Sequence, residues 1–324
     1  MNIILYYILG LSVLLIFFYN SKKISIYTSL YKKINDSTPL IGGLGIYLFF
    51  ILGVVTLYFT NYELVIKNLW VIILTTLIFF IGIWDDIFNI SYKIRLLSIF
   101  LIIFIFLKID NRFVVEYLYF KSLDKTFILG DFSFYITPVF IMLLLNSINM
   151  ADGINGNSSL IFLYFFILIF DSNNQLNPFL ILITLPLIIF LIFNLKNLSY
   201  LGDSGVYFIS TFISLYLIEH YKTNTTNFAC EEIFLILMIP GIDMFRLFCI
   251  RIYQKKNPFK GDLNHLHHLL INKFNLTTSL IFYGLLVLWP FSLNSMFDNL
   301  VLYLIFINLL IYSFLIFYLK KNEY

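Results

Sequence analysis

Apolar runs follow one another along the chain, with short polar segments between them. A helix that crosses a membrane needs about 20 mainly apolar residues, and few charges interrupt these runs. This pattern is typical of membrane helices and differs from the amphipathic pattern of a soluble core. It predicts an all-α polytopic membrane protein with about 10–11 transmembrane helices, near residues 3–19, 40–60, 68–84, 94–107, 135–150, 158–170, 178–194, 205–219, 232–250, 279–294 and 299–318.

Composition supports a single membrane domain over residues 1–324. The chain is 60% hydrophobic and only 12% charged, with a mean hydropathy of +0.91, whereas soluble domains are roughly 25% charged. A net charge of +3 gives no reason to expect a nucleic acid partner. Cys230 and Cys249 have neither a CxxC spacing nor a histidine at metal-ligand spacing, so no disulfide framework or zinc site is expected. The first run, 3–19, lacks a basic segment and a cleavage site and is expected to be a retained helix.

Lysine and arginine collect in alternate polar segments, which sets the orientation. By the positive-inside rule these segments are cytoplasmic, with the N-terminus outside and the C-terminus in the cytoplasm. Between 113 and 134 the sequence alternates, as FVVEYLYF and FILGDFSF, which predicts a small external hairpin or an interfacial segment. The candidate catalytic loops all fall on the cytoplasmic side, at 20–39, 85–93, 146–157, 195–204 and 251–278.

An acidic pair ends the third apolar run, in GIWDDIFNISYKIR. Asp85 and Asp86 repel each other unless a cation or a proton intervenes, so the pair suits Mg²⁺ binding. If the pair stood alone, a solvated helix end would be the alternative interpretation. Lys93 and Arg95 follow and are placed to meet phosphate oxygens, although the positive-inside rule alone also explains them.

A second polar group lies in NSINMADGINGNSS. Asn146, Asn149 and Asp152 fall at i, i+3 and i+6 and share one helical face, which is costly in a membrane helix without a purpose. Gly153 and Gly156 break the helix and free backbone N–H groups for a nucleotide or phosphate. A plain turn would also use Asp and Gly but would not need the two asparagines within the apolar run.

Two shorter motifs are weaker. Asp203 in YLGDSGVY could be an ordinary helix cap, and the PLIGG segment at 39–43 allows close backbone packing. Both fall on the side predicted to be cytoplasmic, which favours a shared site.

Three of the four histidines lie in RIYQKKNPFKGDLNHLHHLL. On a regular helix, His265, His267 and His268 point in different directions, unlike the i, i+4 pair of a helical zinc site. Recognition of an anion fits better, because imidazoles and neighbouring cations can donate to a diphosphate while carboxylates orient them. The neighbouring groups are Arg246, Arg251, Lys255, Lys256, Asp243 and Asp262.

Acidic residues, cations and broken helices on one side indicate a magnesium and phosphate site beside lipid, and hence phosphoryl transfer to or from a membrane-embedded substrate. The alternative is a transporter or lipid flippase that only binds phosphate. A transporter places ionisable groups near the bilayer midplane, often in two related halves. The charges here lie at one face, and no internal repeat is found.

The motifs PLIGG, GIWDDIFNIS, NSINMADGING, FN followed by GDSG, and PGIDMFR leading to NPFKGDLNHLHH occur in this order from about Pro39 to His268. In this set the chain resembles the polyprenyl-phosphate N-acetylhexosamine-1-phosphate transferases. That family includes enzymes that start O-antigen, enterobacterial common antigen and teichoic acid linkage units, and the phospho-MurNAc-pentapeptide transferase. The HLHH and NPF segments are more similar to the amino-sugar branch.

The resemblance implies transfer of HexNAc-1-phosphate from a UDP-amino sugar to undecaprenyl phosphate, with Mg²⁺ (or Mn²⁺) required and UMP released. It implies the start of a cell-surface glycan such as O-antigen, capsule or a teichoic acid linkage, in the bacterial inner membrane with the active site at the cytoplasmic face. A homodimer is a further expectation. Two alternatives stay open for the donor: a MurNAc-pentapeptide, or a modified sugar such as N-acetylfucosamine or N-acetylquinovosamine. The mechanism also stays open between one-step transfer and covalent two-step transfer.

The resemblance also implies roles for individual residues. Asp85 is the candidate base, Asp86 and Asp203 are the metal ligands, and Asn155 stands where the family commonly has a second Asp, near the uracil. Val206 replaces the Ser that usually follows GDxG. The expected catalytic residues are Asp85, Asp86, Asp152 and His265, and the expected substrate-binding residues are Lys93, Asn146, Asn149, Asn155, Arg246, Arg251, His267 and His268.

Overall fold

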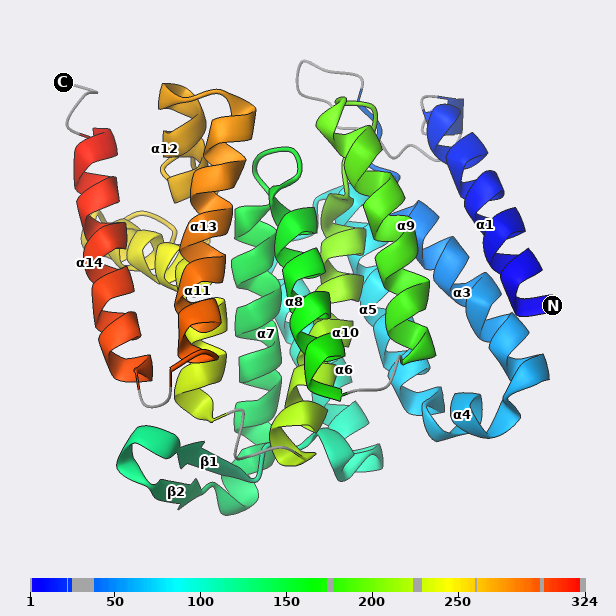
Figure 1. The fold of residues 1–324 in the computed structure, drawn as a ribbon, viewed down its shortest axis with the longest axis horizontal. Coiled ribbons are helices and arrows are strands. Elements are labelled where there is room, and N and C mark those ends of the chain that lie inside the picture. Colours follow the sequence, from blue (N-terminus) through cyan, green and yellow to red (C-terminus); the bar gives the residue numbers. More distant parts are fainter. Residues whose placement is uncertain are drawn as a thin grey trace. The chain divides into compact units, whose positions relative to one another are not determined.

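The computed structural model describes residues 2–21, 23–24, 38–173, 177–223, 229–259, 261–297 and 300–320 and confirms the all-α polytopic fold (Figure 1). Every predicted apolar run is a helix there. Seven of the helices in these ranges are long and apolar enough to cross a membrane. The other four predicted spans are α1 (Asn2–Tyr19), α6 (Tyr92–Ile109), α8 (Asn157–Asn173) and α10 (Gly202–Thr223). Of these, α6 carries three cations, and α1 and α8 have shorter apolar stretches. Most of the predicted loop 20–39 lies outside the described residues.

The chain divides into two compact units. Unit 1 comprises residues 1–111 and 162–216, and unit 2 comprises 112–161 and 217–324. Unit 1 contains α1 (Asn2–Tyr19), α3 (Gly42–Thr60), α4 (Tyr62–Lys67), α5 (Leu69–Phe88), α6 (Tyr92–Ile109), α9 (Pro178–Leu195), most of α8 (Asn157–Asn173) and most of α10 (Gly202–Thr223). In this unit α3 packs against α1 and α9, and α5 packs against α6.

Glycines let the backbones of unit 1 approach closely. A Cβ at Gly43 would lie 2.3 Å from the Gly205 nitrogen, so α3 and α10 pack without side chains between them. The Gly43 N–H donates to the Leu201 carbonyl at 2.8 Å. Tyr200 donates to the Pro39 carbonyl at 2.8 Å. The PLIGG segment is therefore paired with the residues just before α10, as its expected role in close packing requires.

Unit 2 is built around α11 (Cys230–Tyr253), which contacts α7 (Ser133–Ala151), α13 (Leu276–Asn294), α14 (Val301–Lys320) and strand β1. Strands β1 (Tyr117–Phe120) and β2 (Lys125–Ile128) form the predicted hairpin, antiparallel with Tyr117 opposite Ile128. The 3₁₀ turns η1 (Asn111–Phe113), η2 (Lys121–Leu123) and η3 (Gly130–Phe132) and the short helix α12 (Leu266–Lys273) complete the unit.

Candidate active site

The acidic pair meets the start of α10 in unit 1. Asp85 and Asp86 lie in the last turn of α5, which ends at Asn89 in the left-handed conformation. Gly82, one turn earlier, faces α10 so closely that a Cβ there would lie 2.3 Å from the Ser204 Cα. This contact brings the two carboxylates to the GDSG motif. We call Asp85, Asp86, Asp203 and their neighbours Arg95 and Tyr207 the acidic cluster.

Asp86 caps α10. Its Oδ1 accepts the Asp203 N–H at 2.8 Å, and its Oδ2 accepts the Ser204 N–H at 3.1 Å. Gly202 has φ +77°, and a Cβ there would come within 2.7 Å of Asp86 Oδ2. The glycine of GDSG is thus needed both for its backbone conformation and for the close approach of this carboxylate.

Asp85 is ion-paired with a cation of the next helix. Its Oδ2 lies 2.6 Å from the Arg95 guanidinium, and only 5% of the Asp85 side chain is exposed. The Tyr207 hydroxyl donates to the same oxygen at 3.5 Å. Arg95 also lies 3.9 Å from the Asp203 carboxylate, so one guanidinium stands between two of the acidic side chains.

The acidic cluster brings three carboxylates together with one guanidinium, which faces Asp85 and Asp203, while Asp86 accepts from the backbone beside them. Carboxylate oxygens are hard ligands, and Mg²⁺ in phosphoryl-transfer sites is bound through one or two of them plus waters and substrate phosphates. One third of the Asp203 side chain is exposed, so it can reach such an ion. Within the described ranges, no group of three or more His, Cys, Asp or Glu side chains is placed to hold a metal ion by itself.

The sequence predicts a substrate-binding role for Lys93, but the cation that lies in the acidic cluster is Arg95. Lys93 is exposed on α6, whereas Arg95 reaches Asp85. No motif marks Tyr207, although its position four residues after Asp203 places it on the same face of α10. That spacing was the signal available in the sequence.

In unit 2, the DGING segment is a turn between α7 and α8. Asp152 is the C-cap of α7 and accepts a hydrogen bond from the Ser158 hydroxyl. The Asn157 amide donates to the Ala151 carbonyl at 2.8 Å and holds the turn closed. Asn146 donates to the Met142 carbonyl of its own helix at 2.7 Å.

The same turn packs against α12. A Cβ at Gly153 would lie 2.1 Å from His267 Nε2 and 2.6 Å from His268 Nε2. Glycine is therefore required here for the two imidazoles to approach the backbone. Two predicted groups, the DGING turn and the histidines, are thereby brought together within unit 2.

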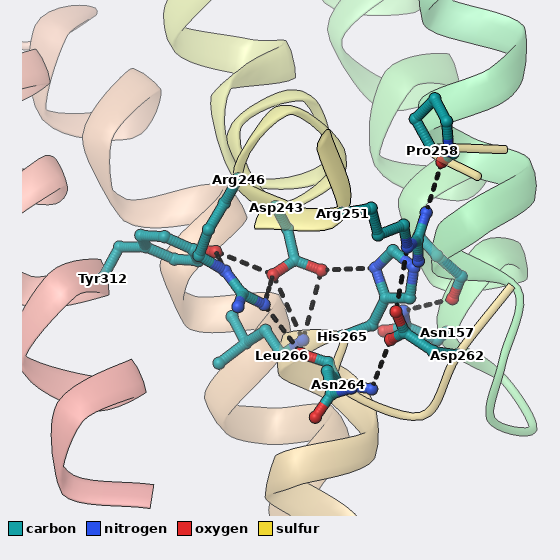
Figure 2. Close-up of polar contacts among 11 residues, drawn as sticks. Asn157, Asp243, Arg246, Arg251, Pro258, Asp262, Asn264, His265, Leu266 and Tyr312 are labelled. Carbon is teal, nitrogen blue, oxygen red and sulfur yellow. Dashed lines mark hydrogen bonds and ion pairs between the residues drawn. The ribbon is translucent and has the colours of Figure 1, made fainter. Parts of the chain in front are cut away.

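Asp243 of α11 organises the segment 257–268, which we call the histidine loop (Figure 2). Its Oδ1 accepts from Arg246 at 2.9 Å and from the Tyr312 hydroxyl at 2.7 Å. Its Oδ2 lies 2.8 Å from His265 Nδ1, which must donate because a carboxylate only accepts. The backbone N–H of Leu266 donates to both oxygens at 3.2 Å, so Asp243 also caps α12.

Arg251 stabilises the first half of the histidine loop through hydrogen bonds. Its Nε donates to Asp262 at 2.9 Å and its guanidinium donates to the Pro258 carbonyl at 2.8 Å. Partial burial alone would raise the pKa of Asp262, but hydrogen bonds from Arg251 and from the backbone of Asn264 outweigh it, so this pKa is lowered. The Asp262 carboxylate is therefore charged at neutral pH and holds Arg251.

His267 is the most buried histidine of the loop, with 1% of the residue exposed. Neither ring nitrogen has a hydrogen-bond partner among the described residues. Its ring stacks at 5.5 Å on His265 and lies 4.2 Å from His268. Burial, and then the neighbouring His268 and His265, lower its pKa to about 3, so the ring stays neutral at physiological pH.

The two arginines expected to bind substrate make their observed hydrogen bonds within the protein. Arg246 donates to Asp243, to the Tyr312 hydroxyl and to the Asn264 carbonyl. Both arginines thus shape the histidine loop, and their contact with a diphosphate stays a prediction. Tyr312 was missed because it lies on the last apolar helix, 44 residues beyond His268, where no motif marks it.

The family model for glycosyl transferase family 4 matches residues 68–220. That range contains Asp85, Asp86, Asp152 and Asp203.

Several similar curated proteins carry the name undecaprenyl-phosphate alpha-N-acetylglucosaminyl 1-phosphate transferase. The Escherichia coli K12 protein is 27% identical over 260 residues, covering 74% of this chain and 67% of its own. The Salmonella typhi protein is 26% identical over 279 residues (79% and 73%), and the Thermotoga maritima protein is 27% identical over 221 residues (67% and 64%).

The helical membrane fold and the names of the similar proteins indicate a polytopic membrane phosphotransferase, so the transporter alternative is set aside. Residues 68–220 match glycosyl transferase family 4, and the chain is similar to undecaprenyl-phosphate alpha-N-acetylglucosaminyl 1-phosphate transferases over most of its length.

Proposed function

We propose that the chain transfers N-acetylglucosamine-1-phosphate from UDP-GlcNAc to undecaprenyl phosphate, releases UMP, and so initiates a cell-surface glycan. The names of the similar proteins support the acceptor and the transferred N-acetylglucosaminyl 1-phosphate group. The observation that carries the proposal is the acidic cluster, in which three carboxylates and one guanidinium meet at the ends of membrane helices.

In the proposed reaction, an oxygen of the lipid phosphate attacks the β-phosphorus of the donor. The new bond joins the two phosphates of the lipid product, and the bond from the β-phosphorus to the oxygen of UMP breaks. Such transfers depend on positioning and charge stabilisation. A phosphate monoester has its second pKa near 6, so the acceptor is largely a dianion at neutral pH and needs little help from a base.

We assign Asp86 and Asp203 to hold Mg²⁺ (or Mn²⁺), which would neutralise the donor diphosphate. Asp86 keeps free lone pairs after accepting two backbone hydrogen bonds. Because the Asp85 carboxylate is bound to Arg95, we assign Asp85 to orient this guanidinium toward the phosphates in place of acting as a base.

We assign donor recognition to the histidine loop and the DGING turn. The hydrogen bond from His265 Nδ1 to Asp243 orients the ring and leaves Nε2 for a phosphate or sugar oxygen. Asp152 and Asn155 are assigned to the nucleotide, and His267 and His268 to the diphosphate or sugar. Asn149 and Asn146, on the same face of α7, remain candidate contacts.

The proposed location is the bacterial inner membrane, with these groups on the cytoplasmic side. The distribution of lysine and arginine over the loops supports this orientation.

The test is a panel of donors given to the purified protein with Mg²⁺ and undecaprenyl phosphate, with UMP as the readout. UDP-GlcNAc should release UMP, and omission of any one component should stop it. The panel includes UDP-linked N-acetylfucosamine and N-acetylquinovosamine, and UDP-MurNAc-pentapeptide. Turnover with one of these but none with UDP-GlcNAc would overturn the proposed donor.

A further inference from the structure

An open pocket of about 700 Å³ lies in unit 2 beside the β1–β2 hairpin. Its polar wall is formed by Lys121 and Ser122 of η2, Glu232 of α11 and Asn294 of α13. Its other wall is the first turns of α14. None of these residues belongs to the histidine loop or the DGING turn, so the proposed transfer reaction does not use this pocket, which we call the hairpin pocket.

The hairpin pocket lies at the ends of three candidate membrane spans. Helix α11 begins at Cys230, α13 ends at Asn294 and α14 begins at Val301. Glu232 precedes Asp243 by eleven residues, which is roughly 16 Å along a helix. The pocket is therefore at the opposite end of α11 from the histidine loop, at the depth where lipid headgroups meet a membrane protein.

Both signs of charge face this pocket. Lys121 Nζ lies 3.9 Å from Glu232 Oε1, a long ion pair that leaves N–H groups of the ammonium available. Glu232 is only 4% exposed. Its Oε2 accepts the Ala229 N–H at 2.6 Å, and its Oε1 accepts from Asn294 at 3.2 Å. The carboxylate is thus fixed in place beside a cation that is one-third exposed.

The α14 wall continues onto a surface that faces lipid. Leu302, Tyr303 and Phe306 are 52%, 70% and 62% exposed, on a helix that is a candidate membrane span. Val301 anchors this wall in an apolar cluster with Leu235 and Met238 of α11. An acyl chain lying along these side chains would have its headgroup at Lys121 and Glu232.

We propose that the hairpin pocket binds a phospholipid whose headgroup carries a phosphate and a primary ammonium, with Lys121 on the phosphate and Glu232 on the ammonium. An anionic headgroup without an amine would meet the buried Glu232 uncompensated. A quaternary ammonium has no N–H to donate to the carboxylate. The bound lipid ties η2 to α11 and α14, and it stabilises the folded protein by mass action.

The experiment measures lipid binding to delipidated, detergent-purified protein by native mass spectrometry, with thermal unfolding as a second readout. The probes are phosphatidylethanolamine, phosphatidylcholine and phosphatidylglycerol with identical acyl chains. Phosphatidylethanolamine should bind at least about tenfold more tightly than the other two, the size expected for one charge-assisted hydrogen bond, and should raise the unfolding temperature most.

Four variants distinguish a specific headgroup site from a nonspecific apolar surface. Lys121→Gln should weaken phosphatidylethanolamine binding about tenfold, and Lys121→Arg should retain it. Glu232→Gln should lose the preference over phosphatidylglycerol while it still folds, because glutamine can make the same helix cap. Lys125→Gln, on the exposed strand β2 and outside the pocket, should bind like the wild type.

Equal binding of the three lipids to the wild type, or unchanged binding by Lys121→Gln, would overturn the proposal. A wild-type preference for phosphatidylglycerol would overturn it as well, because it would mean that the cation alone selects the lipid.

Discussion

Replacing Tyr312 by phenylalanine removes one hydroxyl from the network that holds the histidine loop. That hydroxyl donates to Asp243 Oδ1 at 2.7 Å and accepts from Arg246 Nε at 2.7 Å (Figure 2). Tyr312 is only 3% exposed, so water does not readily replace the lost partner. Phenylalanine keeps the ring and its packing, which makes the change a test of the hydrogen bonds.

The structure sets the size of the effect. A hydrogen bond to a charged group contributes about 1.5–3 kcal/mol, and about 1.4 kcal/mol corresponds to a factor of ten. Because Asp243 also holds His265 and the start of α12, a loosened Asp243 misplaces the imidazoles. Tyr312→Phe should lower kcat/KM for the UDP-sugar by roughly ten- to a hundredfold.

The assay is steady-state kinetics with each substrate varied in turn. If Tyr312 positions the donor-binding loop, the apparent affinity for the UDP-sugar should weaken while that for undecaprenyl phosphate changes little. Tyr318→Phe is the matched control, since Tyr318 lies on the same helix and its ring contacts Lys273 without use of the hydroxyl. Wild-type donor kinetics in Tyr312→Phe, or an equal loss for both substrates, would refute the positioning role.

Three further predictions concern the metal, the histidine loop and the topology. Asp203→Asn should remove most activity while the protein inserts and purifies normally, because the side chain is one-third exposed and its carboxylate acts on the charge of the transition state and not on packing. Near wild-type turnover would show that Asp203 is not a metal ligand. The pKa of His267 is lowered from 6.5 to about 3 in the folded protein. Between these two pH values the imidazole is protonated in the unfolded chain but neutral in the folded protein. The free energy of unfolding should therefore fall as the pH drops from 6.5 toward 3. His267→Gln should flatten this part of the pH profile of thermal stability, and an unchanged profile would contradict the assignment. On a background without Cys230 and Cys249, a cysteine at Asn264 should be labelled only by reagents that reach the cytoplasm, and a cysteine at Asp124 should be labelled from outside. The reverse pattern would contradict the prediction that the candidate catalytic loops all lie on the cytoplasmic side.

The helices were predictable because each carries its own signal. An apolar run of membrane-spanning length leaves the backbone no option but a helix, so all eleven runs appear as helices in the described ranges. The alternation around β1 and β2 predicted the hairpin in the same way. The helices α4 and α12, with six and eight residues, were missed because they are too short and too polar to stand out as apolar runs.

The partners within the sites were less predictable, because they depend on packing between distant segments. The sequence indicated Asp86 and Asp203 as candidate metal ligands. It did not show that Asp86 caps the helix that begins beside Asp203. Lys93 and Arg95 looked alike in the loop, yet two positions on a helix differ by roughly 200°. Only Arg95 therefore meets Asp85.

Tyr312 illustrates the same limit in unit 2. Nothing in the YSF context of a lipid-embedded helix distinguishes a tyrosine that binds Asp243 from one that faces lipid. The DGING turn and the histidines were predicted separately, and only the fold puts Gly153 against His267.

The measurement that tests the central claim most directly follows the β-phosphorus of the donor. UDP-GlcNAc carrying radioactive phosphorus at the β position is incubated with purified protein, Mg²⁺ and undecaprenyl phosphate, and the aqueous and lipid phases are separated. Transfer of N-acetylglucosamine-1-phosphate predicts that the label moves into the lipid phase in equal amount to the unlabelled UMP released. Labelled UDP in the aqueous phase would show transfer of the sugar alone and would contradict the account, as would label that stays in the donor.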